Sequence, residues 1–152
     1  MSKVIAMGCD HGGPEFKNEL KAYLEGLGNT VIDCGIQPGE AVDYPEKAFE
    51  VASKVVSGEA QLGILICGTG IGMSMAANKV KGIRAAACSE VYSAKLTRIH
   101  NNANMLCLGA RVIGIETAKL MAEEFVNAEF EQGGRHQRRV DLITKIEQEN
   151  SL

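Results

Sequence analysis

A cysteine followed by three glycines at alternate positions is the part of this sequence best suited to chemistry. The stretch "ICGTGIGMSMAANKV" (residues 66–80) places Cys67 directly before Gly68, Gly70 and Gly72. Backbone amides left uncovered by glycine at the start of a helix form a concavity that binds anions. The anion is either a phosphate or an oxyanion that develops during a reaction. A helix N-terminus also lowers the pKa of a nearby thiol, which would make Cys67 available as a base or nucleophile.

Other interpretations of the same loop remain open. The dinucleotide-binding pattern G-x-G-x-x-G fits Gly68 and Gly70, but Met73 takes the place of the third glycine and the loop follows the third predicted strand rather than the first. Glu90 lies about 20 residues further on, where a ribose-binding acid would sit. A Walker loop is excluded, because no Gly-Lys-Ser/Thr follows. A plain strand-to-helix turn needs one glycine rather than three, and Cys67 alone fits a small buried hydrophobe equally well.

Five short apolar segments alternate with segments of helical period, and together they must position the cysteine and the glycines. The apolar segments are continuous, as is typical of strands buried on both faces. They cover residues 3–9, 30–35, 62–68, 82–89 and 104–110. The helical patterns cover residues 14–28, 45–58, 117–128 and 136–150. This alternation predicts an α/β fold, a three-layer α/β/α Rossmann-like domain with a five-stranded parallel sheet and a C-terminal helical tail.

Two of the helical segments have a clear apolar face. In residues 14–28, Pro14 suits the first turn and Gly28 suits the stop. The apolar positions of that helix are Phe16, Leu20, Tyr23, Leu24 and Leu27. In the tail, Val140, Ile143 and Ile146 form one narrow stripe on an otherwise polar segment, the pattern of a helix that packs on something.

The carboxyl ends of parallel strands meet at one edge of a sheet, and ligand crevices in such folds lie at that edge. Asp10 and His11 follow the first predicted strand, residues 67–72 follow the third, and Ser89 and Glu90 follow the fourth. We therefore expect these groups to lie along one edge. The length of 152 residues fits a single domain, so residues 1–152 are expected to form one unit.

Composition limits the class of protein. Hydrophobic residues make up 45% of the chain, yet no stretch of 18 apolar residues is present, so no membrane span is expected. The beginning, "MSKVIAMGCDHGG", lacks an apolar secretory segment, which favours a cytoplasmic protein. The net charge of −3 gives no overall reason to bind nucleic acid. Five cysteines without a Cys-x-x-Cys pair are expected to be reduced, and no metal site is predicted.

A basic cluster, "RHQRR", begins at Arg135. Arg135 and Arg139 are spaced i, i+4, so both can reach one anion from one face of a helix. A solvated face or a nucleic-acid patch would have the same charge. Because no stacking aromatic residues lie within the cluster and the chain is net acidic, a single phosphate group is the preferred ligand.

Six sequence blocks together resemble the type B ribose-5-phosphate isomerases, a family that also contains allose-6-phosphate and galactose-6-phosphate isomerases. The resemblance extends from about residue 4 to residue 148. The blocks are "GCDHGG" (8–13), "DYP" (43–45), "ILICGTGIGMSMAANK" (64–79), "CSEVYSA" (88–94), "HNNANMLCLGAR" (100–111) and "GGRHQRRV" (133–140).

The resemblance implies an aldose–ketose isomerase that works through an enediol without metal or cofactor. Cys67 would be the base that moves a proton between C1 and C2, Thr69 and His100 would assist ring opening with His100 as proton donor, and Asp10 would hold sugar hydroxyls. Relatives with a glutamate at the end of the glycine loop lack the cysteine; Met73 stands there in this chain. The implied substrate contacts are Asp10, His11, Tyr44, Gly68, Thr69, Gly70, Ile71, Gly72, Asn101, Arg111, Arg135 and Arg139.

The resemblance also implies a homodimer whose active sites draw on both chains. Whether two dimers pair into a tetramer is left open. The helix of residues 136–150 is expected to pack on the partner subunit. Simpler alternatives remain for two residues: His11 as a helix-start residue capped by Asp10, and His100 as a surface histidine. The substrate is a five- or six-carbon sugar phosphate, ribose 5-phosphate or allose or galactose 6-phosphate. The alternative in which the protein is not an enzyme is a non-catalytic nucleotide- or sugar-phosphate-binding module.

Overall fold

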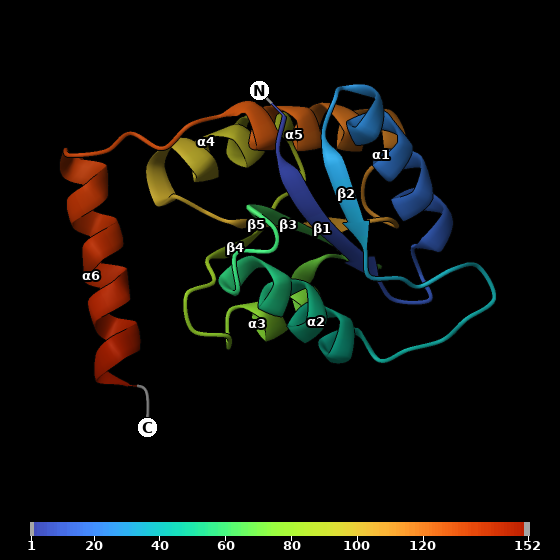
Figure 1. Cartoon of the computed structure of the whole chain (residues 1–152), viewed down its shortest axis with the longest axis horizontal. Helices are drawn as coiled ribbons and strands as arrows, with labels where there is room; N and C mark the ends of the chain where they lie inside the picture. The colour runs from blue at the N-terminus through green and yellow to red at the C-terminus, as the bar shows by residue number, and fades with distance from the viewer. Residues whose placement is uncertain (1, 151–152) are drawn as a thin grey trace.

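The computed structural model describes residues 2–150, which form five parallel strands and six helices in strict alternation, apart from two consecutive helices at the end (Figure 1). The strands lie inside the five predicted apolar segments, so the α/β prediction is confirmed. The strands are β1 (Val4–Cys9), β2 (Thr30–Asp33), β3 (Leu62–Cys67), β4 (Ala85–Ala87) and β5 (Met105–Gly109). The helices are α1 (Pro14–Gly26), α2 (Tyr44–Val56), α3 (Ile71–Ala77), α4 (Val91–Asn101), α5 (Ile115–Asn127) and α6 (Arg135–Glu149).

The strands pair in the order β2-β1-β3-β5-β4. The chain passes from β1 to β2 on one side and later from β3 to β4 and then β5 on the other, so the direction of winding changes between β1 and β3. Such a change opens a crevice at the carboxyl ends of the two strands, because the following loops turn to opposite faces. The loops after β1 and β3 are the ones that carry Asp10 and the glycines.

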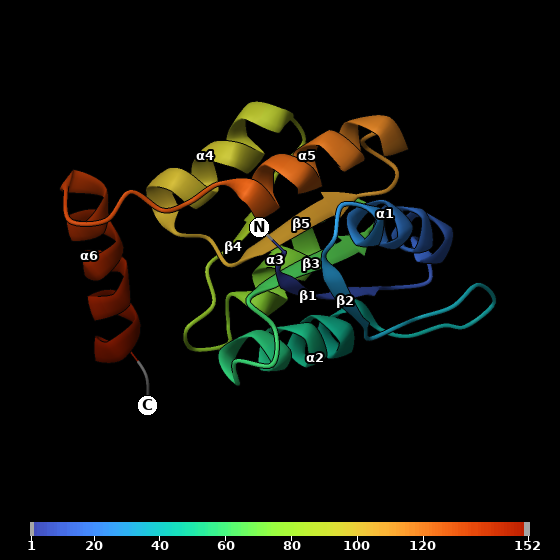
Figure 2. The ribbon, with the colours of Figure 1, turned by 45° about the horizontal axis from the view of Figure 1, so that its top comes forward.

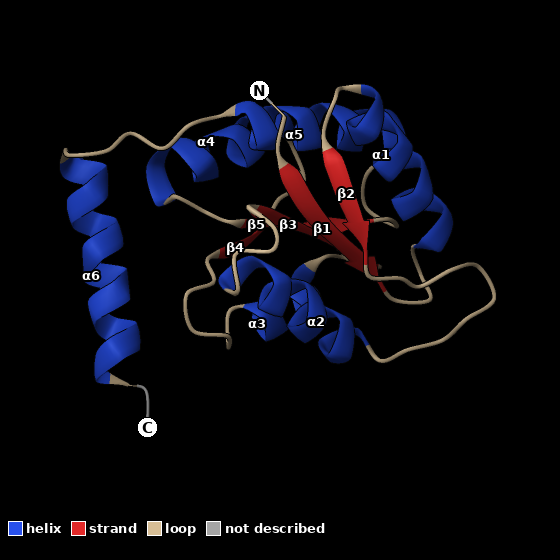
Figure 3. Cartoon of the chain, in the orientation of Figure 1, coloured by secondary structure: helices blue, strands red, loops and turns tan. Residues whose placement is uncertain are grey.

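Helices cover both faces of the sheet and give the three layers (Figure 3). Helices α1, α4 and α5 pack on one face, where the core includes Leu20, Leu24 and Phe125. Helices α2 and α3 pack on the other face, where Val51 and Met73 are buried against the strands. None of the helices in residues 2–150 is long and apolar enough to cross a membrane.

A lysine takes a core position that the apolar pattern of α1 did not predict. Lys17 is fully buried, and its Nζ lies 2.6 Å from Asp33 Oδ1 at the end of β2. Burial opposes ionisation of Asp33, but hydrogen bonds from Lys17 and from the Gly35 amide outweigh it and lower the pKa of this carboxyl. Leu27, expected on the apolar face, lies just after α1 and is 46% exposed. The helix is therefore anchored by an ion pair as well as by apolar contacts.

Helix α6 stands outside the three layers and packs against α4 (Figures 1 and 2). It begins one residue before the predicted tail. Of the predicted stripe only Val140 is buried; Ile143 is 46% exposed and Ile146 is 62% exposed, and Leu142 beside them is 54% exposed. Contacts within the chain thus bury only the first part of the apolar stripe of α6.

Candidate active site

Cys67 is the last residue of β3, and its thiol lies under the glycine loop. The Gly70 amide donates a hydrogen bond to Cys67 Sγ at a distance of 3.1 Å, and the cysteine is only 6% exposed. Gly70 is also the residue immediately before α3, where free amides concentrate positive potential. The predicted meeting of thiol, glycines and helix N-terminus is present, with one of the amides directed at the sulfur.

Close packing explains why the loop consists of glycines. Gly70 has φ +80°, and a Cβ there would lie 2.9 Å from the Leu108 carbonyl carbon of the neighbouring strand. A Cβ on Gly72 would lie 2.7 Å from the ring of Tyr44, at the start of α2. Gly70 is therefore required by both backbone angle and space, and Gly72 lets the tyrosine ring approach the loop.

The loops after β1 and β5 bring further site residues to the same edge. Asp10 Oδ1 accepts a hydrogen bond from the Gly12 amide at 2.8 Å, while the residue that precedes α1 is Gly13, so the alternative of Asp10 as helix cap is wrong. The Arg111 amide donates to the Gly68 carbonyl at 3.0 Å, and its side chain passes over Gly68. His11 and Arg111 are exposed at this edge.

Glu90 does not have the geometry of a ribose-binding acid. Both of its carboxylate oxygens lie 3.0 Å from the Ser93 amide, so the side chain caps the N-terminus of α4. The hydrogen bonds at this cap lower the pKa of the Glu90 carboxyl. The dinucleotide interpretation thereby loses its acidic residue.

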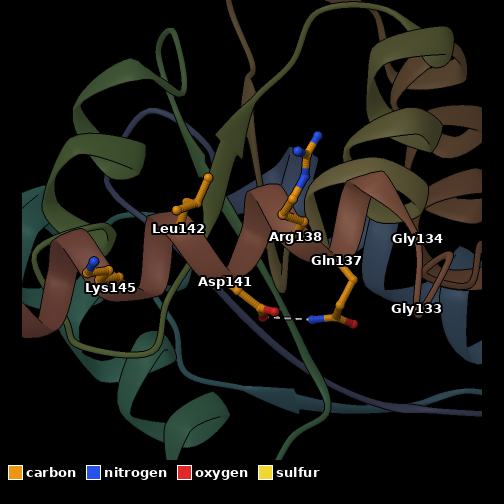
Figure 4. Close-up of a pocket in the computed structure, with 7 residues that line it drawn as sticks. All are labelled: Gly133, Gly134, Gln137, Arg138, Asp141, Leu142 and Lys145. Carbon is orange, nitrogen blue, oxygen red and sulfur yellow. Dashed lines mark hydrogen bonds between the residues drawn. The ribbon is translucent and has the colours of Figure 1, made fainter.

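Two surface hollows are lined by residues of loops that follow the strands. One of about 400 Å³ is lined by His11 and the segment before α2, and one of about 260 Å³ is lined by Thr69, Ile71 and the residues after β4. A third, of about 450 Å³, lies along the outer side of α6 and is lined only by residues of that helix and the two glycines before it (Figure 4). The predicted site residues do not line this third hollow.

The remaining predicted residues gather in a second cluster, at the end of α4 and the start of α6. His100 and Asn101 close α4, and Arg135 and Arg139 lie in the first two turns of α6, where both are exposed. The His100 ring stacks on the ring of His136, with centroids 4.0 Å apart and planes 9° apart. His136 was not predicted as a site residue; its place next to Arg135 was the only signal in the sequence.

The two clusters lie at opposite ends of the strands, the first at the carboxyl ends and the second near the amino ends. Cys67 ends β3, whereas α4 runs back past the sheet and delivers His100 to the point where β5 begins. Figure 2 shows the strand arrows pointing away from α6. Since a strand advances about 3.3 Å per residue, the length of β3 alone separates the clusters by roughly 15 Å. Cys67 and His100 of one chain therefore do not share a site.

Two arginines hold the backbone that follows His100. Arg84 donates from Nε and Nη2 to the carbonyl of Asn102, at 3.1 and 2.9 Å, and from Nε to the carbonyl of Asn101. Arg98 donates to the Ala103 carbonyl at 2.8 Å. Guanidinium groups at a helix C-terminus satisfy its free carbonyls and oppose its negative dipole end. The end of α4 is thus a fixed platform for the histidine.

One group of possible metal ligands was not evident from spacing along the chain. The side chains of His100, Glu131 and His136 place a ligand atom each within 4.8 Å of one another. An imidazole ligates through a lone pair in the plane of its ring, and two nearly parallel stacked rings do not direct these lone pairs to a common point. Arg135 and Arg139 also add positive charge. The group as it is arranged therefore does not fit a metal ion.

The other four cysteines differ from Cys67 in their surroundings, and all five are free thiols. Burial raises the pKa of Cys9, Cys34 and Cys107. Burial and the Glu90 carboxylate raise the pKa of Cys88 to about 11. These four are kept in the protonated form at neutral pH, which agrees with a packing role.

Comparison with known proteins places the chain in a family. A sequence model described as Ribose/Galactose Isomerase matches residues 5–143. The chain belongs to this family. It is 53% identical over 146 residues to ribose-5-phosphate isomerase B of Escherichia coli. The matched region covers 96% of this chain and 97% of that protein.

Solved structures agree in fold over nearly the whole chain. Ribose-5-phosphate isomerase B of Clostridium thermocellum is 49% identical, with a TM-score of 0.93, over 97% of this chain and 99% of that one. Ribose-5-phosphate isomerase B of Mycoplasma genitalium with bound ribulose-5-phosphate is 43% identical, with a TM-score of 0.90, over 97% of each chain. The predicted Rossmann-like class and the predicted family are confirmed.

Proposed function

We propose that this protein is an aldose–ketose isomerase that interconverts ribose 5-phosphate and ribulose 5-phosphate in the cytoplasm, with residues 1–152 acting as one domain. The observation that carries the proposal is the position of the Cys67 thiol at the end of β3. Its sulfur accepts a hydrogen bond from the Gly70 amide at the start of a helix. A binding module needs no thiol in that position, whereas isomerisation needs a base. The names of the relatives support the five-carbon substrate.

In the proposed reaction, the open-chain aldose lies over the glycine loop. The Cys67 thiolate removes the proton from C2, the carbonyl oxygen on C1 gains a proton, and an enediol forms. Return of a proton to C1, with loss of the proton on the C2 oxygen, gives the ketose. Amides of Gly68, Gly70 and Gly72 stabilise the developing negative charge on oxygen. Asp10 holds hydroxyl groups, Thr69 assists ring opening, and Tyr44 and Ile71 form the adjoining walls.

The second cluster completes the site in this proposal. His100 donates a proton for ring opening, Asn101 contacts the sugar, and Arg135 and Arg139 bind the phosphate together with His11 and Arg111 of the other edge. Guanidinium groups suit a doubly charged phosphate because they form paired, charge-assisted hydrogen bonds. Because the two clusters of one chain lie at opposite edges, a site with both needs a second copy. We therefore propose a homodimer with composite active sites, in which the exposed part of the α6 stripe packs on the partner.

The substrate is tested by measuring isomerase activity on ribose 5-phosphate, allose 6-phosphate and galactose 6-phosphate under identical conditions. We expect the highest kcat/KM for ribose 5-phosphate. A clear preference for a six-carbon substrate would replace the substrate assignment but keep the isomerase. Binding of all three without turnover would favour the non-catalytic module and contradict the proposal.

A further inference from the structure

We propose that His136 is a positioning residue that holds the His100 ring and the Arg135–Arg139 pair in one rigid unit. This inference rests on the proposed function, since it assigns His100 as proton donor and the arginines as phosphate clamp. His136 itself is not assigned a contact with substrate. Instead, it contacts α4, follows a linker that is itself attached to α4, and lies between the two arginines in the sequence.

The first contact is the ring stack. His100 ends α4 and His136 lies in the first turn of α6, so their face-to-face packing, with centroids 4.0 Å apart, joins two helices through two side chains. The His136 side chain is only 12% exposed. A flat ring against a flat ring leaves His100 little freedom to rotate about its side-chain bonds, whereas a histidine at a free helix end samples several rotamers.

The second contact fixes the linker that leads into α6. The Glu131 amide donates to the carbonyl of Ile99 at 3.1 Å, directly beside His100 in the chain. The Glu131 carboxylate also faces His136, with 3.6 Å between Oε2 and Nε2. The segment that carries His136 is therefore attached to α4 by backbone and by side chain, so the stack does not depend on one contact.

The helical period then fixes the arginines. His136 and Val140 are i, i+4 and so share one face of α6; Val140 is 5% exposed. This face packs on α4. Arg135 and Arg139 each precede one of these residues by one position, about 100° around the helix, and both are exposed. Docking of the His136–Val140 face consequently fixes the positions on α6 from which both arginine side chains extend, relative to His100.

Charge favours a neutral ring in the supporting position. Desolvation, His100 and Arg135 lower the pKa of His136. A neutral imidazole stacks on its neighbour without the repulsion that two cations would have. His136 can thus support His100 in either protonation state of the proton donor.

The test compares His136→Ala, His136→Phe and Gln137→Ala. Gln137 lies on the same turn but is hydrogen-bonded to Asp141 along the helix, at 2.9 Å (Figure 4), and serves as the matched control. We expect His136→Ala to lower kcat/KM by about 10- to 100-fold, because small displacements of reacting groups have effects of this size. Both kcat and KM should change, since donor and clamp are displaced together. His136→Phe, which keeps a flat ring, should recover most of the loss, and Gln137→Ala should behave as the wild type.

Two readouts do not depend on turnover. In NMR spectra, the ring-proton resonance of His100 should shift in His136→Ala, where the ring current of the stack is lost, and not in Gln137→Ala. The dissociation constant for inorganic phosphate, measured by calorimetry, should rise in His136→Ala. Unchanged kinetics and phosphate affinity in folded His136→Ala, or a loss that His136→Phe does not recover, would overturn the inference. If the wild type lacked isomerase activity, the proposed function would fail, while the resonance and the phosphate affinity would still test the positioning role.

Discussion

Cys67 differs from the other cysteines of the chain because its sulfur accepts a backbone hydrogen bond beside the start of a helix. A backbone amide points at Sγ, and the N-terminus of α3 follows within the same loop. Hydrogen bonds to an ionised acceptor are stronger than neutral ones. The remaining thiols are either deep in the core or raised in pKa by burial. A single backbone donor at a strand end thus distinguishes Cys67, the base of the proposed reaction, from the other four cysteines.

Replacement of Cys67 by alanine should leave a folded protein that has lost isomerisation. We expect kcat to fall by about 10²- to 10⁴-fold, the usual effect of removing a general base. Steady-state kinetics on ribose 5-phosphate and circular dichroism measure the two effects. Cys34→Ala and Cys107→Ala are the matched controls, and both should retain most of the activity. A folded Cys67→Ala protein with near-normal turnover would refute the role of the thiol.

Removal of divalent metal should leave activity unchanged. An enediolate can be stabilised by backbone amides, and the His100–Glu131–His136 group is arranged as a stack rather than as a set of converging ligands. The measurement is kcat/KM after prolonged treatment with a chelator, followed by addition of single divalent ions. Loss of activity that only an added ion restores would contradict the metal-free mechanism.

At the scale of elements, the glycine loop between β3 and α3 combines a backbone requirement with a packing requirement. Thr69 packs against Gly109 of the neighbouring strand so closely that a Cβ on Gly109 would lie 2.8 Å from the Thr69 backbone. The loop is therefore shaped from below by β5 as well as by its own sequence. This close contact fixes the path of the loop backbone over β5.

Gly70→Ala should lower both stability and activity. The substitution forces a side chain into φ +80° and toward the Leu108 carbonyl carbon at 2.9 Å, and strain of this kind typically costs about 1–3 kcal/mol. Displacement of the Gly70 amide would also remove the donor to Cys67. Urea unfolding and kcat measure the two effects. Gly26→Ala, at the end of α1 with no atom within 4 Å of the added Cβ, is the control and should be tolerated.

The central strands β1, β3 and β5 were predictable because burial on both faces leaves a continuous apolar signal. The edge strands β2 and β4 are short and only partly buried, and they lie inside longer predicted segments. The burial of Lys17 was not predictable, because it depends on the ion pair with Asp33, a partner that is distant in sequence. The position of the cysteine loop beside Asp10 and His11 was predictable from the rule that ligands bind at the carboxyl ends of parallel strands. His136 could not be recognised, since only the packing of α6 on α4 brings its ring onto His100. Local pattern thus predicted elements and one edge of the site, whereas contacts between distant segments decided the rest.

At the scale of the whole molecule, the two clusters of predicted site residues are separated by the sheet itself. In the proposed reaction each cluster supplies groups that the other lacks: the Cys67 cluster would supply the base and the amides, and the His100 cluster would supply the proton donor and two arginines. The apolar stripe of α6 is left half exposed beside the second cluster. A closed pair with two-fold symmetry would let each chain both lend and borrow groups, and would cover exposed apolar surface at the same time.

Mixing inactive variants tests this arrangement. If Cys67 and Arg139 of one site come from different chains, a mixed dimer of Cys67→Ala and Arg139→Ala has one site with both defects and one with neither. Random exchange should restore roughly a quarter of the wild-type activity, because half of the dimers are mixed and half of their sites are intact. Mixing His100→Asn with Arg139→Ala is the matched control: both residues lie at the same edge, so every site of that mixed dimer keeps one defect and no activity should return. Demonstrated exchange of subunits without recovery in the first mixture, or equal recovery in both, would show that the two edges do not combine across the pair.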